Sequence, residues 1–173
     1  MSTPPPCMSC SQNAEDTDRC PENWIASDEH WRVSHAVGAA VAGWLVLVPR
    51  RHVVTIADLT DEEAATLGTW QIRVSRALHA VTGCAKTYVA QFAELAGFEH
   101  VHFHVVPRAD DLPHHFQGPR VFRLLGKPDQ PAITPAEMTR ISIALHSHLR
   151  HTPTSPGGLA TLAGSPDGRG VAT

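Results

Sequence analysis

The chain has 173 residues, of which 42% are hydrophobic and 18% are charged, and its formal net charge is −3. That length fits one domain, and the apolar fraction is enough to form a hydrophobic core. The balance of 14 basic and 17 acidic residues argues against a protein that binds nucleic-acid backbones. No apolar run approaches the ~18 residues of a membrane-spanning helix, and the N-terminus lacks a signal-peptide pattern. We therefore expect a soluble, cytoplasmic, single-domain protein.

The two ends of the chain differ in composition from the middle. Residues 1–6 are rich in Pro, and residues 152–173 are rich in Gly, Pro, Ser and Thr without any periodicity. Such segments bury too little apolar surface to offset the entropy lost on ordering. We expect a flexible leader at 1–6, one domain at 7–151 and a disordered tail at 152–173.

Short apolar or alternating runs between Gly and Pro residues predict the strands. The run 43–49 (GWLVLVP) is continuously apolar, whereas 99–108 (EHVHFHVVPR) alternates. Strands grouped around one long helix indicate an α+β domain with a largely antiparallel sheet. In chain order, the predicted strands are 31–36, 43–49, 87–92, 99–108 and a late one at 120–125.

Two helices are predicted from their start signals. Thr60 and Glu63 form a capping box ahead of an apolar series with helical spacing, and Gly83 ends that series. Thr134 and Glu137 form a second capping box, with Pro at the first helical position. The sequence therefore predicts one main helix and a C-terminal helix.

The most specific segment contains three alternating histidines, His100, His102 and His104. On a β-strand, alternate side chains lie on the same face about 6.6 Å apart. The three imidazoles would then share one face of the predicted strand. The opposite face would be apolar and able to pack on a helix, with Val101, Phe103 and Val105.

Folding alone does not require such a face, because Thr, Lys or Glu would serve without a group that titrates near neutral pH. Two chemistries can use it. Alternate imidazoles can ligate a catalytic zinc that keeps one position open for water. In the other case, one imidazole is a nucleophile and its neighbours hold a phosphate. The residues alone do not choose between these two chemistries. They also allow a third interpretation, in which the histidines are simply half-exposed on an edge strand.

A Cys-x-x-Cys pair, Cys7 and Cys10, lies near the N-terminus. In a chain without an export signal, this spacing indicates metal or redox chemistry rather than a disulfide framework. The alternative is two unligated thiols in a flexible leader. Cys20 and Cys84 have no partner at an informative spacing, and we interpret them as ordinary thiols.

These motifs together resemble the histidine-triad (HIT) family of nucleotide hydrolases and transferases. The segment HVHFHVV (100–106) matches the family signature His-φ-His-φ-His-φ-φ, where φ is apolar. The segment GWLVLVPRRH (43–52) is similar to the family's GH-hLVhP-K/R-x-H strand, and the Cys pair is typical of many bacterial members. The resemblance covers roughly residues 7–108.

The resemblance implies an antiparallel sheet of about five strands with one main helix, and a homodimer. It also implies substrates in which a nucleotide is joined at its α-phosphate to a leaving group, such as dinucleoside polyphosphates or nucleoside phosphoramidates. His102 matches the residue that attacks the phosphorus, and His104 matches the one that holds the non-bridging oxygens. A neutral imidazole suits this attack, because a phosphoryl centre repels anionic nucleophiles.

In zinc-containing members, the metal is structural and has two Cys and two His ligands, which match Cys7, Cys10, His52 and His100. Two other family features have no counterpart here. The Gly-Gln turn ahead of the triad lacks its Gln, and no acidic residue for the ribose occurs near His35. Gln91 replaces the family's Asn and offers an amide to the substrate.

Some residues outside these motifs stay open to more than one interpretation. His114 and His115 are expected to be solvated loop residues, although they could reach a leaving phosphate. The four Trp residues are expected in the core or an interface, unless one lines a base pocket.

Three functions follow from these observations. The first is a hydrolase or nucleotidyl transferase that works through a nucleotidyl-histidine on His102. The second is a zinc-stabilised nucleotide-binding or sensing protein without turnover. The third is a zinc hydrolase whose open metal is held by the three alternating histidines.

Overall fold

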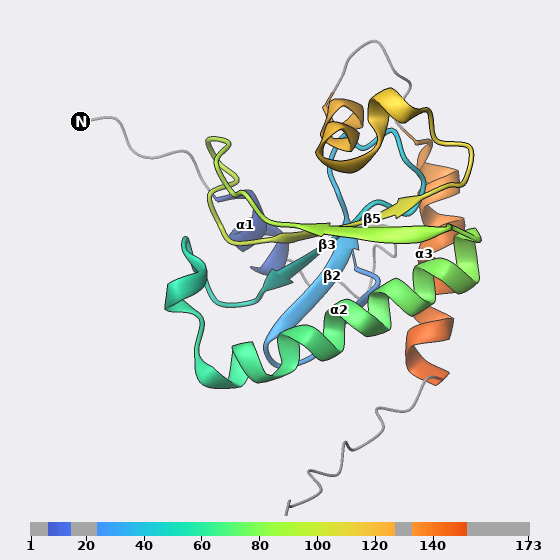
Figure 1. Ribbon diagram of the computed structural model, residues 1–173. Helices are drawn as coiled ribbons and strands as arrows, with labels where there is room; N and C mark the ends of the chain where they lie inside the picture. Colours follow the sequence, from blue (N-terminus) through green and yellow to red (C-terminus); the bar gives the residue numbers. More distant parts are fainter. Residues whose placement is uncertain (1–6, 15–23, 127–132, 152–173) are drawn as a thin grey trace, which may run out of the picture.

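The computed structural model describes residues 7–14, 24–126 and 133–151, which form a five-stranded antiparallel sheet and its covering helices (Figure 1). The strands are β1 (Ala26–Ser27), β2 (Trp31–His35), β3 (Leu45–Pro49), β4 (Lys86–Ala90) and β5 (Phe103–Arg108). They follow the order β1-β2-β3-β5-β4, so β3 lies between β2 and β5 at the centre. This architecture confirms the predicted α+β class with its antiparallel sheet.

Three α-helices and three short 3-10 helices complete the described part of the chain. The helices are α1 (Met8–Ala14), α2 (Asp61–Thr82), α3 (Pro135–His151), η2 (Ile56–Asp58), η3 (His114–Phe116) and η4 (Gly118–Leu124). In Figure 1, the long α2 (green) runs beneath the sheet, and η3 and η4 (gold) lie above it. None of the helices in this part of the chain is long and apolar enough to cross a membrane.

Alternation along the strands creates two apolar clusters, one on each face of the sheet. The larger cluster joins the sheet to α2 and α3, and Val101, Phe103 and Val105 are all buried in it, as predicted. The smaller cluster lies on the opposite face and includes Trp44 with Val121 of η4. Apolar residues therefore pack on both faces of the sheet. The face with the smaller cluster is covered only in part, which leaves room for a site.

Both predicted helices are present. Thr60 and Glu63 make the two reciprocal bonds of a capping box at the start of α2. Gly83 ends the helix in the left-handed conformation with φ 68°, which favours glycine. At α3, Thr134 accepts the bond from the Glu137 amide, but the Glu137 carboxylate pairs with Arg140 instead of completing a capping box.

The structure corrects two strand predictions. The sequence predicts a strand at 120–125, but residues 118–124 form the 3-10 helix η4, which begins at a Gly-Pro pair. The buried side chains of this helix, Val121 and Leu124, are three residues apart, as 3-10 geometry requires. The fifth strand is instead the two-residue β1, which is too short to give a sequence pattern.

The predicted strand at 99–108 is shorter than expected, because β5 begins at Phe103. His100 and His102 therefore lie in the segment just before the strand, and only His104 lies within it. The predicted leader at 1–6 and tail at 152–173 fall outside the described residues, as does Cys20.

Candidate functional site

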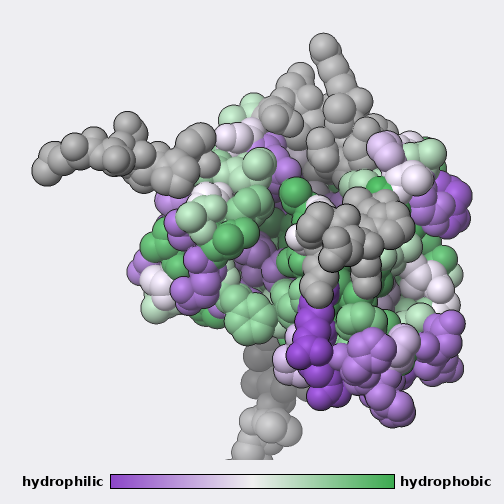
Figure 2. Space-filling model, turned by 90° about the horizontal axis from the view of Figure 1, so that it is seen from above, coloured by the Kyte–Doolittle hydropathy of each residue, from purple (hydrophilic) through white to green (hydrophobic). Residues whose placement is uncertain are grey.

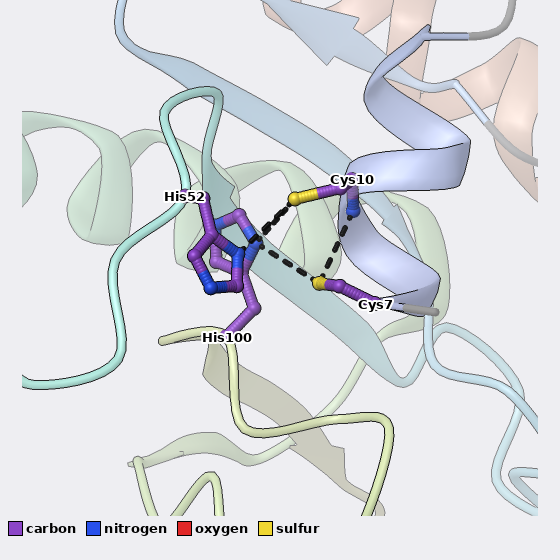
Figure 3. A group of neighbouring side chains, drawn as sticks. All are labelled: Cys7, Cys10, His52 and His100. Carbon is purple, nitrogen blue, oxygen red and sulfur yellow. Dashed lines mark hydrogen bonds between the residues drawn. The ribbon is translucent and has the colours of Figure 1, made fainter. Parts of the chain in front are cut away.

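Four side chains from three separate segments meet at one end of the sheet. Cys7 and Cys10 come from the start of α1, His52 from the loop after β3, and His100 from the segment before β5 (Figure 3). One ligand atom from each lies within 4.8 Å of all the others. These are the four residues that the resemblance implied as metal ligands.

The spacing of these atoms fits a tetrahedral zinc site. With ordinary Zn–S and Zn–N bond lengths, ligand S and N atoms lie roughly 3.5 Å apart. His100 Nδ1 is 3.5 Å from Cys7 Sγ and 3.6 Å from Cys10 Sγ, and His52 Nδ1 is 3.1 Å from Cys10 Sγ. The donor set of two sulfurs and two nitrogens is also the one that zinc prefers.

A second contact fixes the ring of His100 in the form that a metal needs. His100 Nε2 lies 3.0 Å from the Pro49 carbonyl oxygen, and a carbonyl can only accept, so Nε2 must carry the proton. Nδ1 is then the unprotonated nitrogen that faces the two sulfurs. This backbone carbonyl orients the imidazole as outer partners of zinc-bound histidines usually do.

The pKa values at this cluster show which groups are protonated when no metal is bound. Burial, with help from Cys7, raises the pKa of the Cys10 thiol from 9.0 to about 11. Burial, together with the neighbouring His52, lowers the pKa of His100 from 6.5 to about 4. Both groups are therefore neutral at pH 7 without a metal, and binding of a divalent cation would displace thiol protons.

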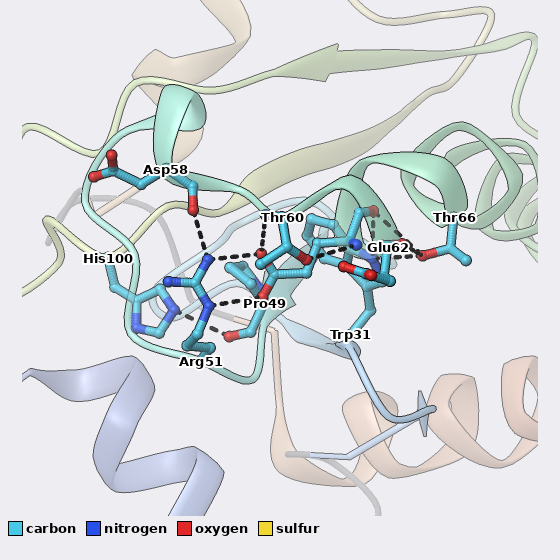
Figure 4. Close-up of polar contacts among 9 residues, drawn as sticks. Trp31, Pro49, Arg51, Asp58, Thr60, Glu62, Thr66 and His100 are labelled. Atoms are coloured by element: carbon cyan, nitrogen blue, oxygen red, sulfur yellow. Dashed lines mark hydrogen bonds and ion pairs between the residues drawn. The ribbon is translucent and has the colours of Figure 1, made fainter.

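An ion pair supports the loop that carries His52. Arg51 donates to both carboxylate oxygens of Glu63, at 3.2 and 2.8 Å, and to the Asp58 carbonyl oxygen at 2.6 Å. Figure 4 shows the contact of Arg51 with Asp58 beside His100 and Pro49. The bond from Arg51 holds the pKa of the Glu63 carboxyl below its usual 4.5. Because Glu63 also caps α2, the loop that carries His52 and the main helix share one buried carboxylate.

Hydrogen bonds attach the short helix α1 to the rest of the molecule. The Met8 amide donates to the Gly97 carbonyl, and Asn13 Nδ2 donates to the carbonyls of Pro49 and Arg50. Arg32, which is completely buried on β2, donates to Asn13 Oδ1 at 2.6 Å. The helix therefore lies at the sheet with one side on the Cys cluster and the other toward a cavity.

A cavity of about 480 Å³ opens on the sheet face opposite α2, beside the Cys cluster. Figure 2 views the molecule from above and shows hydrophobic residues gathered in the middle of this face. The volume lies in the usual range for a small-molecule site. The apolar lining includes Val46, Val48, Phe92, Leu95, Phe98, Phe122 and Leu125. The polar lining consists of Ser9, Gln12, His35, Glu94, His102 and His104.

The two remaining histidines of the triad meet at this cavity. The rings of His102 and His104 are 4.8 Å apart and nearly perpendicular. His102 Nδ1 lies 2.8 Å from the His100 carbonyl oxygen, so Nδ1 must be the protonated nitrogen. In the neutral ring the lone pair then lies on the other nitrogen, Nε2, which is the form that a nucleophilic imidazole needs.

His104 differs from His102 in its surroundings. It is buried, packs edge to face against Phe122 and accepts a bond from the Trp44 indole N–H. Burial, and then the neighbouring His102, lowers the pKa of His104 from 6.5 to about 4. At pH 7 this imidazole is therefore neutral.

The three histidines do not converge on one point, which opposes the hypothesis of an open zinc between them. His100 faces the sulfurs, whereas His102 and His104 line the cavity. Within the described residues, the one group of three or more ligand side chains close enough for a metal is the Cys-His cluster. The Cys-His cluster and the cavity thus contain different members of the triad.

Other predicted site residues lie outside the cavity lining. Gln91 is half-buried just after β4, and His114 and His115 are exposed on η3. His35 does line the cavity, and its Nε2 contacts the Met138 carbonyl and the Ser142 hydroxyl. The role of Gln91 in substrate binding stays a prediction.

Sequence reasoning missed two aromatic contacts of the site. Trp44 packs against His104, with ring centroids 5.8 Å apart, and Phe122 packs edge to face against both of these rings. Trp44 occupies a strand motif that the sequence does identify, but Phe122 lies in the segment whose pattern predicts a strand. Trp31 and Trp70 are buried in the main core, as expected.

Comparisons with known proteins agree with this geometry. A profile of the HIT domain family matches residues 17–111, which is more than half of the chain. A zinc-bound histidine triad family protein from Mycobacterium smegmatis is 22% identical, with a TM-score of 0.59 over 83% of this chain and 93% of its own. A histidine triad protein from Bradyrhizobium japonicum is 29% identical, with a TM-score of 0.61 over 73% of this chain and 89% of its own.

A histidine triad nucleotide-binding protein from Sulfolobus tokodaii, described as hypothetical, is 15% identical, with a TM-score of 0.57 over 73% of this chain and 83% of its own. No curated protein matches the sequence significantly. The match over residues 17–111 and the shared fold confirm the resemblance that the motifs indicated. The chain belongs to the HIT domain family.

Proposed function

We propose that this protein is a hydrolase or nucleotidyl transferase that acts at the α-phosphate of a nucleotide conjugate, with His102 as the nucleophile. The observation that carries this proposal is the bond from His102 Nδ1 to the His100 carbonyl, because in the neutral ring it puts the lone pair on Nε2 of a residue that lines the cavity. HIT family membership supports nucleotide binding with hydrolase or transferase activity. The covalent step on His102 is our extension of it.

The reaction takes place in two steps. In the first, the lone pair of His102 Nε2 forms a P–N bond, the bond from phosphorus to the leaving group breaks, and the leaving group takes a proton from water. In the second, water or another acceptor attacks the nucleotidyl-histidine, loses its proton and restores the imidazole. His104 would hold the non-bridging oxygens as negative charge builds up on them.

The cavity suits a nucleoside beside a phosphate. Its apolar wall contains Phe92, Phe98 and Phe122, which offer flat surfaces to a base, and Phe122 packs against His104 of the triad. A buried phosphate requires donors, and ring N–H groups can supply them. The substrate class that we propose is a dinucleoside polyphosphate, a nucleoside phosphoramidate or a similar conjugate.

We further propose that Cys7, Cys10, His52 and His100 hold a structural zinc. The zinc-bound relative from Mycobacterium smegmatis supports this assignment, as does the geometry of the cluster. A zinc bound there would tie α1 to the sheet, and α1 provides Ser9 and Gln12 to the cavity. Its contribution is to the shape of the site, and the chemistry belongs to His102 and His104.

One observation favours the second candidate, a nucleotide-binding protein without turnover. Among the described residues that line the cavity there is no Lys or Arg, and the one carboxylate is that of Glu94. The usual acidic contact to the ribose and the Gln ahead of the triad are also missing from the sequence. Binding would then rest on the apolar wall and the imidazoles.

A substrate screen separates the two functions. The purified protein is incubated with nucleoside phosphoramidates and with dinucleoside polyphosphates, and nucleoside monophosphate release is followed by chromatography. His102→Ala is the matched control, because it removes the nucleophile from a position outside the hydrophobic core. Turnover by the wild type alone supports the enzyme. Saturable binding by both proteins without product would favour the sensor.

A further inference from the structure

The indole of Trp44 makes an unusual contact with the histidine triad. Its Nε1 lies 3.0 Å from His104 Nδ1, and both residues are buried, with exposed fractions of 0% and 6%. The two rings meet edge to face at 80°. A bond of this length between buried aromatic nitrogens is well formed and shielded from competing water.

The chemistry of the two rings fixes the position of the His104 proton. An indole N–H can only donate, so His104 Nδ1 must be the acceptor. A neutral imidazole with an unprotonated Nδ1 carries its proton on Nε2. A protonated imidazole would turn an N–H toward the indole N–H and lose the bond, and the other Nδ1–H tautomer would lose it too.

We propose that Trp44 is a positioning residue that holds His104 in the Nε2–H tautomer, so that His104 can only donate toward the cavity. The catalytic consequence of this inference rests on the proposed function. The Nε2–H group would then donate to a non-bridging oxygen of the phosphate that His102 attacks.

The two neighbouring imidazoles are thereby held in opposite tautomers. The backbone carbonyl of His100 fixes the proton of His102 on Nδ1 and leaves Nε2 as a nucleophile. Trp44 fixes the proton of His104 on Nε2 and makes it a donor. Two identical side chains whose rings are 4.8 Å apart therefore take complementary roles. In a mixture of tautomers, the molecules with the wrong tautomer at either residue could not react.

The tautomer can be measured on the wild-type protein without any substrate. Nitrogen NMR of uniformly labelled protein at neutral pH distinguishes protonated from unprotonated ring nitrogens, with the His104 signals assigned from their loss in His104→Gln. We expect an unprotonated Nδ1, a protonated Nε2, and a scalar coupling through the hydrogen bond between Trp44 Nε1 and His104 Nδ1. A protonated Nδ1, or no such coupling, would overturn the inference whether or not the protein is an enzyme.

Two Trp→Phe variants separate positioning from packing. Trp44→Phe removes the donor, whereas Trp70→Phe makes the same change at another buried indole, which donates to Asp28 on the other side of the sheet. In Trp44→Phe we expect the His104 nitrogen signals to move toward those of mixed tautomers, and kcat to fall by roughly tenfold or more with little change in KM. In Trp70→Phe we expect the His104 signals and kcat to stay near those of the wild type.

Each outcome has a distinct meaning. Equal losses of kcat in both variants would show that the effect is one of packing, and the positioning role would be wrong. If Trp44→Phe alters the His104 signals but not kcat, Trp44 does hold the tautomer, but the tautomer does not matter for catalysis. If the wild type turns over no substrate, the proposed function fails, and the NMR result alone decides the tautomer.

Discussion

Replacing Cys10 by Ser should uncouple thermal stability from zinc. Cys10 Sγ lies near the ring nitrogens of both His52 and His100, so its loss removes one of four ligands from the centre of the cluster. Cys10 is only partly buried, and the Ser side chain is of similar size. The substitution therefore costs little packing energy, and the change in Tm should come from the loss of metal binding.

The size of the effect follows from linkage between binding and folding. A ligand present at about 100 times its Kd stabilises the folded state by about 2.7 kcal/mol. For a domain of this size, 1 kcal/mol corresponds to about 2–4 °C in Tm, so the wild type should lose about 5–11 °C when a chelator is added. Cys10→Ser should melt near the temperature of the chelated wild type, with or without zinc.

The measurement is a set of thermal melts with zinc and with chelator, together with metal analysis of each protein. Cys84→Ser is the matched control, because it changes a buried cysteine that lies outside the cluster. It should lower Tm in both conditions but keep the difference between them. A wild type without zinc whose Tm ignores the chelator would refute the metal assignment.

The other predictions concern the support of the site and its protonation. Glu63→Gln removes the charge that pairs with Arg51 and weakens the α2 cap, so urea unfolding should show a loss of about 1–2 kcal/mol, and an unchanged midpoint would contradict the role of this carboxylate. Burial lowers the pKa of His104 from 6.5 to about 4, so the unfolded chain binds more protons than the folded protein between these pH values. The free energy of unfolding should therefore fall as pH drops from 6.5 toward 4. His104→Gln should make this pH dependence weaker in thermal melts across the same range. His104→Ala should reduce kcat by roughly 10²–10³, whereas His102→Ala should abolish turnover, and equal modest losses in steady-state assays would exclude the nucleophile.

Local signals predicted most of the fold. The Thr60 capping box, the apolar spacing of α2 and the stop at Gly83 are all encoded within one turn of the residues that they affect, and the structure reproduces them. The failures occur where pairing depends on distant residues. β1 exists only because Ala26 and Ser27 lie opposite Val33 and Arg32, and residues of η4 are helical although their composition also fits a strand.

The site was predictable where a motif specified it. The proposed metal ligands followed from the Cys pair and the family resemblance, and these residues meet as the resemblance implied. Alternation correctly separates the histidines from Val101, Phe103 and Val105, but it could not show that His100 contacts the two sulfurs while His102 lines the cavity, because those neighbours come from distant segments. The contact of Trp44 with His104 joins residues 60 apart in the chain, and only the register of β3 against β5 brings them together.

The most direct test of the central claim is mass spectrometry of the protein during turnover of a nucleoside phosphoramidate. Acid quenching is avoided because P–N bonds on histidine are labile, and the protein is digested at alkaline pH before peptide mapping. We predict a nucleoside monophosphate adduct on His102 in the wild type and no adduct in His102→Ala. Product release without any adduct, or an adduct on another residue, would contradict the account.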